Sequence, residues 1–284
     1  MDGIIIINKP KNCTSHDIVR KAKKVFNEKV GHTGTLDPNA TGVLPLLVGK
    51  GTQIAKYIIN HDKIYEAVLK LGEKTDTADI EGSILETKKV PEESLKTEKV
   101  KQVLNSFIGK QEQTPPIYSA IKVRGKKLYE YARKGENVEI KPRQIEIYNM
   151  ELIEIDVQNK TIKFKVECSK GTYIRTLCEN IAEKLDTVGY MKDLNRTKVG
   201  EFSIDDSIKI EELENGEYNN FITIEEYFKN YENINLNEKK LQLFLNGVQL
   251  TLNFEDGIYK IYYDNKFIGI GTIKNKLLKR DIIL

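Results

Sequence analysis

Short apolar and alternating stretches mark the expected strands of this chain. Residues 3–7 and 43–48 are almost uninterrupted runs of apolar residues, which predicts strands that are buried on both faces. Residues 65–71 and 162–168 alternate apolar with polar or charged side chains, the pattern of strands with one buried face. Residues 114–123 contain two adjacent prolines, so we expect them to be extended rather than helical.

Helices are expected where apolar residues recur every three or four positions. Residues 18–26 show this spacing, and Thr14 and Ser15 before them are residue types that cap helix N-termini. Residues 100–107 show it as well, and Gly109 lies just past their end. Further helices are expected at residues 51–59, 126–134 and 174–185. Residues 72–82, rich in threonine and acidic side chains, are expected to form a loop.

The pattern changes in the last fifty residues. From about residue 237 short strands are expected, with a hairpin turn at Asp264-Asn265. We therefore expect a large domain at residues 1–236 and a small β domain at residues 237–284. Within the first, residues 201–236 form an acidic connecting segment that we expect to be helical and peripheral.

Composition narrows the class of protein. Hydrophobic residues make up 39% of the 284 residues and charged residues 31%, which is typical of a soluble globular protein. No apolar run is long enough to cross a membrane or to form a signal peptide, so we expect a cytoplasmic protein without a membrane partner. Three cysteines without CxxC spacing favour neither a disulfide scaffold nor a zinc site.

Charge is distributed unevenly. Residues 201–232 hold ten acidic residues against two lysines, so the rest of the chain is more basic than the net charge of +3 suggests. Residues 121–143 contain eight Lys and Arg residues against three Glu, interleaved with tyrosines, a pattern that suits looped RNA and equally a solvated helix face. The candidate RNA-binding residues of this region are Lys122, Arg124, Lys126, Lys127 and Arg143.

Residues 31–42 are the strongest candidate for chemistry. Three glycines and Pro38 set an irregular loop around a single carboxylate, Asp37, between two apolar strands. Asp37 is a candidate nucleophile or general base. An aspartate before Pro-Asn is equally compatible with an ordinary turn. His32, in the same loop, is a candidate partner of Asp37 or of an RNA base, or a histidine bonded to the backbone.

A second candidate segment joins the strand at residues 162–168 to the following helix. Tyr173 and Arg175 fall in the first turn of that helix, where an arginine is disfavoured by the positive end of the helix dipole unless it has an anionic partner. Arg175 is therefore a candidate partner of Asp37 or of a phosphate; the alternative is a surface arginine that follows Thr172 as an ordinary N-cap. Tyr65, on the apolar face of its strand, is compatible with a core position or with stacking on a base.

These segments, read in order, resemble the TruB family of tRNA pseudouridine synthases. The resemblance runs through residues 3–200 almost without interruption, and the ordered set of motifs is far more specific than any one of them. The matching motifs are Asn8-Lys9-Pro10 with Thr14-Ser15, residues 31–38 with 41–44, residues 63–67, residues 72–77 with Gly82, residues 113–120 with Lys122, Gly125 with residues 129–133, residues 168–175, and residues 194–197.

The resemblance implies an activity and roles for three residues. The family converts uridine 55 in the T-loop of tRNA to pseudouridine without a cofactor or metal. Asp37 matches the catalytic aspartate, and Arg175 matches the arginine that pairs with it. Tyr65 matches the tyrosine that stacks on the target base near the proton lost from C5. Asp37 is expected to stay ionised, because its arginine partner lowers its pKa.

Three further residues match the family's substrate contacts. His32 matches the histidine that enters the T-loop as bases flip out, and Tyr173 and Leu194 match residues that line the uracil pocket. Asn195 departs from the pattern, because many relatives carry a second arginine there beside Arg196. The departure bears on one phosphate or packing contact and not on the chemistry.

The resemblance also implies a fold and partners. We expect an α+β catalytic domain with a central mixed, mostly antiparallel sheet flanked by helices, and a short PUA-like RNA-binding domain at the C-terminus. The expected partner is the T-arm of tRNA, and the protein is expected to act as a monomer without an obligate protein partner. Two alternatives remain: the catalytic subunit of a guide-RNA pseudouridylation particle, and a non-catalytic tRNA-binding or tRNA-folding protein.

Overall fold

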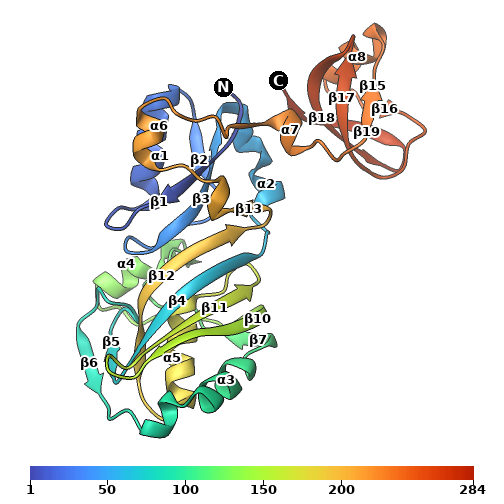
Figure 1. The fold of residues 1–284 in the computed structure, drawn as a ribbon. Coiled ribbons are helices and arrows are strands. Elements are labelled where there is room, and N and C mark those ends of the chain that lie inside the picture. The colour runs from blue at the N-terminus through green and yellow to red at the C-terminus, as the bar shows by residue number, and fades with distance from the viewer.

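A large mixed sheet forms the body of the computed structural model, which describes residues 1–284 (Figure 1). All its pairings are antiparallel except that of β3 with β12. Its strands, in spatial order, are β14 (Ile222–Thr223), β1 (Gly3–Lys9), β3 (Thr41–Val48), β12 (Gly189–Val199), β4 (Lys63–Leu71), β11 (Thr161–Cys168), β10 (Arg143–Asp156) and β7 (Gly109–Gln113), with β13 (Phe202–Ser203) on β12 and β2 (Val30–His32) on β3.

Four of the eight helices contribute apolar side chains to the core on one face of this sheet. The helices are α1 (Ser15–Phe26), α2 (Ala55–Ile58), α3 (Thr97–Asn105), α4 (Leu128–Arg133), α5 (Ile174–Lys184), α6 (Ile210–Glu214), α7 (Ile224–Tyr227) and α8 (Glu238–Leu245), with 3-10 turns at Gly49–Ile54, Glu92–Leu95 and Ile204–Asp206. Apolar side chains of α1, α3 and α5 join those of β4 and β11 in one continuous core. In Figure 1, α1 lies at the β1 end of the sheet, and α3 and α5 lie at the β10 end.

The apolar strand β1 is buried on both faces, as its sequence predicts. Ile5 and Ile7 point into the core beneath the helices. Ile4 and Ile6 point the other way, into a second apolar cluster that contains Phe228 and Ile282. The helix that follows β1 starts at the expected place, because Thr14 caps it and exchanges hydrogen bonds with Asp17.

The acidic segment is more tightly integrated than we expected. It contains two short helices, and it is not peripheral: Ile210 and Leu213 of α6 enter the main core, and β14 extends the edge of the main sheet beside β1. Lys21 of α1 forms a salt bridge with Glu214. The charged residues thus occupy the exposed side of short helices whose apolar residues are buried.

The C-terminal residues form a second sheet, which Figure 1 shows at one end of the molecule. The expected hairpin is present, because Asp264 and Asn265 both adopt positive φ angles of 47° and 57°. This sheet begins at Asn233 rather than at residue 237, and α8 packs against it, so the region is not built from strands alone. Its strands are β15 (Asn233–Asn235), β17 (Gly257–Tyr263), β18 (Lys266–Lys274), β19 (Leu277–Ile283) and β16 (Leu250–Thr251).

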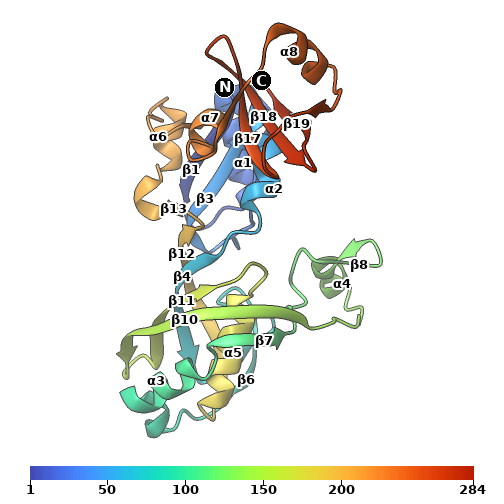
Figure 2. The same cartoon turned by 90° about the vertical axis from the view of Figure 1, so that its right-hand side faces the viewer.

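Several features of the large domain were not predicted. Residues 189–199 form the central strand β12, whose alternation is broken by a bulge near Asp193 and by the buried Arg196. The loop expected at residues 72–82 instead contains β5 (Glu73–Thr75), which forms a hairpin with β6 (Ile84–Thr87). A second hairpin, β8 (Lys122–Val123) with β9 (Lys126–Lys127), forms an arm with α4 that stands out from the sheet in Figure 2.

The predicted α+β class, with its large mixed sheet, is confirmed.

Candidate active site

A pocket of about 550 Å³ opens beside the middle of the main sheet. The loop between β2 and β3 forms one wall, and the start of α5 with the turn before it forms another. The first residues of β4 and the chain around Tyr118 complete it. This volume lies within the range of roughly 300–1,000 Å³ that is usual for small-ligand sites, and it suits a single nucleotide.

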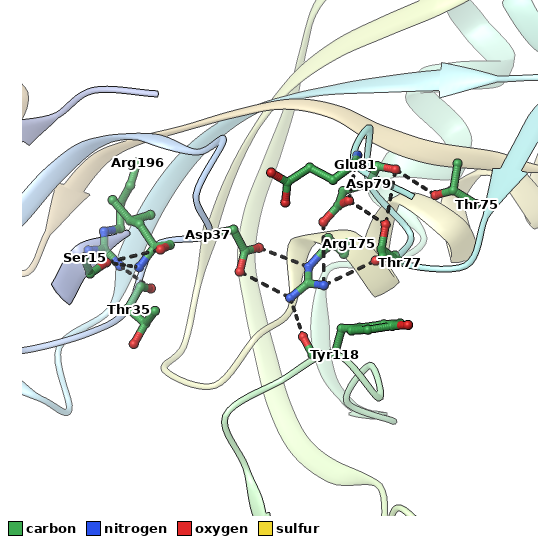
Figure 3. Close-up of polar contacts among 11 residues, drawn as sticks. Ser15, Thr35, Asp37, Thr75, Thr77, Asp79, Glu81, Tyr118, Arg175 and Arg196 are labelled. Carbon is green, nitrogen blue, oxygen red and sulfur yellow. Dashed lines mark hydrogen bonds and ion pairs between the residues drawn. The ribbon is translucent and has the colours of Figure 1, made fainter. Parts of the chain in front are cut away.

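Asp37 and Arg175 meet in this pocket through a two-point contact. Arg175 Nε lies 3.0 Å from Asp37 Oδ2, and Arg175 Nη2 lies 3.3 Å from Asp37 Oδ1. Figure 3 shows the two side chains facing each other from different elements. The Arg175 side chain is 7% exposed and that of Asp37 is 34% exposed. The arginine is therefore fixed within the protein, while the carboxylate keeps a face open to the pocket.

The guanidinium of Arg175 is held on its remaining sides as well. Nη2 donates a 2.9 Å hydrogen bond to the Tyr118 carbonyl, and Nη1 donates a 3.2 Å bond to the Thr77 carbonyl. Asp79 Oδ2 lies 3.7 Å from Nη1, and Asp79 Oδ1 accepts hydrogen bonds from Thr77 Oγ1 and from the backbone of Glu81. The planar fork of the arginine thus has one orientation, which serves Asp37.

The loop that carries Asp37 is pinned on both sides of the aspartate. Ser15, at the start of α1, accepts a hydrogen bond from the Leu36 backbone N–H and donates one to the Leu36 carbonyl. The ammonium of Lys9, completely buried, donates a 3.0 Å bond to the Pro38 carbonyl. These contacts fix the backbone next to Asp37, so its carboxylate is presented by a rigid scaffold.

Arg196 supports the same loop from β12. It is 1% exposed and donates hydrogen bonds to the carbonyls of Gly34, Thr35 and Val43. Gly42, at the start of β3, has a positive φ of 105°, and a Cβ there would meet the Arg196 backbone. Glycine is therefore required where β3 approaches β12, immediately after the loop.

The electrostatics of Asp37 correct one expectation. We expected Arg175 to lower the pKa of this carboxyl, and it does act in that direction. Burial acts in the opposite direction and is the larger effect, and Asp79 adds to it, so the pKa of Asp37 is raised above its ordinary value. The carboxylate is partly desolvated and correspondingly more basic than a surface aspartate.

The structure brings four other predicted residues to the pocket or near it. Tyr65, Tyr173 and Leu194 line the pocket together with Asp37 and Arg175. His32 does not line it: the residue ends β2, and its Nδ1 is buried without a hydrogen-bond partner. Burial also lowers the pKa of His32.

The predicted basic residues lie on the arm and its connections to the sheet. Lys122, Lys126 and Lys127 belong to the β8–β9 hairpin, Arg124 lies at its turn, and Arg143 begins β10. Lys127 donates a hydrogen bond to Tyr129 OH, and Tyr129 lines the pocket. The basic arm is therefore continuous with the pocket wall.

Sequence reasoning missed several residues of this site. Lys9, Ser15 and Arg196 stood within recognised motifs, but the pattern gave no sign that they hold the Asp37 loop. Asp79 stood in the acidic, threonine-rich segment expected to form a loop, and it contacts Arg175. No three His, Cys, Asp or Glu side chains gather in a way that would hold a metal ion.

Family models match this chain in two adjoining segments. The model of the TruB family pseudouridylate synthase N-terminal domain matches residues 21–174, and the model of the tRNA pseudouridylate synthase B C-terminal domain matches residues 175–232. The chain belongs to the TruB family of pseudouridylate synthases. It is therefore an isomerase, as its motifs predicted.

Curated TruB relatives match nearly the whole chain. Three proteins named tRNA pseudouridine synthase B are 44%, 43% and 40% identical to it, from Clostridium kluyveri, Caldanaerobacter subterraneus and Aquifex aeolicus. The matches cover 97–98% of this chain and 96–98% of each relative.

Solved structures share the TruB-type fold. The chain is similar to one in a crystal structure of a Cbf5-Nop10-Gar1 complex, with a TM-score of 0.68 and 24% identity over 99% of this chain and 83% of that one. A chain of an H/ACA RNP bound to a substrate RNA containing 2'-deoxyuridine gives a TM-score of 0.66 at 22% identity, covering 99% of this chain and 85% of that one. Separately, none of the helices is both long and apolar enough to span a membrane.

Proposed function

We propose that this protein converts uridine 55 in the T-loop of tRNA to pseudouridine, with Asp37 as the catalytic carboxylate. The observation that carries the proposal is the two-point contact of Asp37 with a buried arginine at the mouth of a nucleotide-sized pocket. The relatives named tRNA pseudouridine synthase B, at 40–45% identity, support tRNA as the substrate.

The proposed reaction requires the base to detach, rotate and rejoin. The bond from N1 to C1′ breaks, C5 bonds to C1′, the C5 proton is lost and N1 gains a proton. The carboxylate of Asp37 can attack C1′, attack C6 or remove a proton from C2′. Tyr65, in the same pocket, is the residue we propose to stack on the base close to the C5 proton.

The arrangement of carboxylates favours isomerisation over hydrolysis. A typical glycosidase uses two carboxyl groups that flank the scissile bond. The second carboxylate near this site, Asp79, contacts Arg175 and bonds to Thr77 and Glu81, and it does not line the pocket. One open carboxylate suits a reaction that keeps the detached base in place.

Uridine in a folded T-loop must leave its stack to reach Asp37. Enzymes that act on a base extrude it into a pocket and read it by stacking and hydrogen bonds. We propose that Tyr173 and Leu194 line the uracil site and that His32 enters the T-loop. The basic arm, with Lys122, Arg124, Lys126, Lys127 and Arg143, and the C-terminal sheet as a PUA-like domain, would hold the RNA backbone.

The direct test uses an unmodified tRNA transcript and the purified full-length protein. Pseudouridine is mapped at single-nucleotide resolution after incubation without any guide RNA or second protein. We expect modification at position 55 alone, and none in a transcript in which that uridine is cytidine. Modification that appears only after a guide RNA is added would favour a guide-dependent enzyme, and tRNA binding without pseudouridine would refute the catalytic assignment.

A further inference from the structure

A buried ammonium group lies in the pocket without a counter-ion. Lys63 begins β4 two residues before Tyr65, on the same face of the strand, and both side chains line the pocket. Lys63 is 8% exposed, and its nitrogen donates one hydrogen bond, to the His61 carbonyl at 2.5 Å. It takes part in none of the salt bridges of the molecule.

The surroundings of Lys63 oppose its charge. Burial is the main cause that lowers its pKa to about 8, and like-charge repulsion from Arg196 acts in the same direction; Cys168 and Asp62 act in the other direction, and Lys170 adds a smaller repulsion. Removing an ammonium from water without a counter-ion is unfavourable for folding. A cation at this position is therefore better explained by an anion that enters the pocket.

The turn before α5 offers further donors beside Lys63. The backbone N–H groups of Lys170, Gly171 and Thr172 have no hydrogen-bond partner within the protein. These three residues line the same pocket, and Gly171 leaves open space where a side chain would stand. Successive free N–H groups in a turn, next to an ammonium, form the kind of concavity that binds phosphate oxygens.

We propose that Lys63 and the turn formed by residues 170–172 bind the phosphate that flanks the flipped uridine. The inference rests on the proposed function, because an extruded nucleotide carries a backbone phosphate with it towards the pocket. Lysines on the arm can meet any nearby phosphate of the RNA. Lys63 is buried, so only a nucleotide that has left its stack brings a phosphate within its reach.

The test uses T-arm hairpins in which a single phosphate is replaced by a neutral methylphosphonate, on the 5′ or the 3′ side of the target uridine. Single-turnover kinetics give the half-saturating enzyme concentration and the maximal rate. For Lys63→Met we expect the half-saturating concentration to rise about tenfold on the unmodified hairpin, since charge-assisted hydrogen bonds are lost. One of the two methylphosphonates should weaken the wild type by a similar factor and Lys63→Met by less than twofold.

Two variants serve as controls. Lys63→Arg keeps the charge and should bind within about threefold of the wild type. Lys70→Met alters a lysine of the same strand whose nitrogen also bonds a backbone carbonyl, that of Asn159, but which lies outside the pocket. It should leave both kinetic parameters unchanged. Thermal melting identifies any variant that is poorly folded.

The outcomes separate this inference from the proposed function. If the wild type forms no pseudouridine in the unmodified hairpin, the proposed function fails. If the wild type does form pseudouridine, but neither methylphosphonate weakens the wild type more than it weakens Lys63→Met, the proposed phosphate site is wrong. A third outcome is that Lys63→Met has a lower melting temperature and a lower maximal rate, and is as sensitive as the wild type to each methylphosphonate. Lys63 would then hold the start of β4 in place instead of binding a phosphate.

Discussion

Asp79 Oδ2 lies 3.7 Å from Nη1 of Arg175, the guanidinium nitrogen that does not touch Asp37 (Figure 3). The arginine therefore faces a carboxylate on either side, and only Asp37 is open to the pocket. Thr75 and Thr77, from the β5–β6 hairpin, in turn hold Asp79. A hairpin distant in sequence from both α5 and the β2–β3 loop thus orients the pair of residues on which the proposed chemistry depends.

We predict that Asp79→Asn lowers the maximal rate of pseudouridine formation about tenfold with little change in tRNA binding. The amide keeps the shape of the side chain but loses its attraction for Arg175, so the guanidinium is held less firmly against Asp37. Asp76→Asn is the matched control, because Asp76 lies in the same hairpin and bonds only the Ser83 backbone. Equal rates for wild type and Asp79→Asn would show that Asp37 and the carbonyls of Thr77 and Tyr118 suffice to orient Arg175.

Arg175→Lys is predicted to reduce the maximal rate roughly 100-fold while the protein remains folded. A lysine keeps the positive charge but cannot contact both oxygens of Asp37 and the carbonyls of Thr77 and Tyr118 at once. Single-turnover rates and melting temperatures should be measured together. A lysine variant as active as the wild type would show that charge alone is sufficient at this position.

Asp37→Asn is predicted to abolish pseudouridine formation and to retain tRNA binding, because the amide has nearly the same shape but cannot act as a nucleophile or base. The raised pKa of Asp37 adds a pH dependence to wild-type activity. The ionised form is lost as the pH falls through this raised pKa. The acid limb of the rate profile should therefore lie at a higher pH than for an ordinary aspartate.

The same shift predicts the stability of that variant. The folded state binds the Asp37 proton more tightly than the unfolded state does, so ionisation of Asp37 destabilises the fold at neutral pH. Asp37→Asn should melt no lower than the wild type at pH 7. The difference should vanish below the unfolded-state pKa of about 3.9, where both side chains are neutral. A variant that melts well below the wild type at pH 7 would show that the ion pair with Arg175 outweighs burial.

The sequence predicted those parts of the site that depend on local pattern. Glycine and proline around Asp37, between two apolar strands, mark a rigid loop, and Arg175 in a first helical turn calls for an anionic partner. Both signals lie within a few residues of the side chain concerned. The contact between these residues, 138 positions apart, was predicted from the resemblance, and the structure contains it.

What the sequence did not predict depends on neighbours that are distant along the chain. Arg196 and Asp193 interrupt the apolar alternation of β12, so the central strand lacks the pattern of a strand. Arg196 is stable there because three carbonyls of another segment accept its hydrogen bonds. Asp79 and Lys63 likewise owe their significance to the fold, which places Asp79 beside Arg175 and Lys63 in the wall of the pocket.

The last prediction concerns how the C-terminal sheet is attached. Ile270 and Ile282 belong to the apolar cluster that contains Ile4 and Phe228. Deleting the sheet would expose this cluster to water. An effect on RNA binding would then be mixed with an effect on the stability of the fold. Asp281 offers a milder change, because its carboxylate accepts hydrogen bonds from Lys56 and Tyr57, at α2 of the large domain.

We predict that Asp281→Ala lowers the melting temperature by about 2–4 °C, the effect of losing roughly 1 kcal/mol in a protein of this size. The sheet, freed from α2, should contact the RNA less well. The tRNA concentration for half-maximal rate should then rise several-fold at low salt, and it should depend less steeply on added salt than in the wild type, because fewer phosphate contacts remain to be weakened by salt. An isolated T-arm hairpin, which we expect not to reach the sheet, should be modified as before.

Glu238→Ala, at an exposed position of α8, is the control for a change of charge on the same domain. It should leave the melting temperature unchanged, and tRNA and the T-arm hairpin should both be modified as by the wild type. If Asp281→Ala slowed the reaction of the hairpin as much as that of tRNA, the attachment would act on the catalytic pocket through α2 and β4. The C-terminal sheet would then stabilise the catalytic site, and its proposed role in holding the remainder of the tRNA would be wrong.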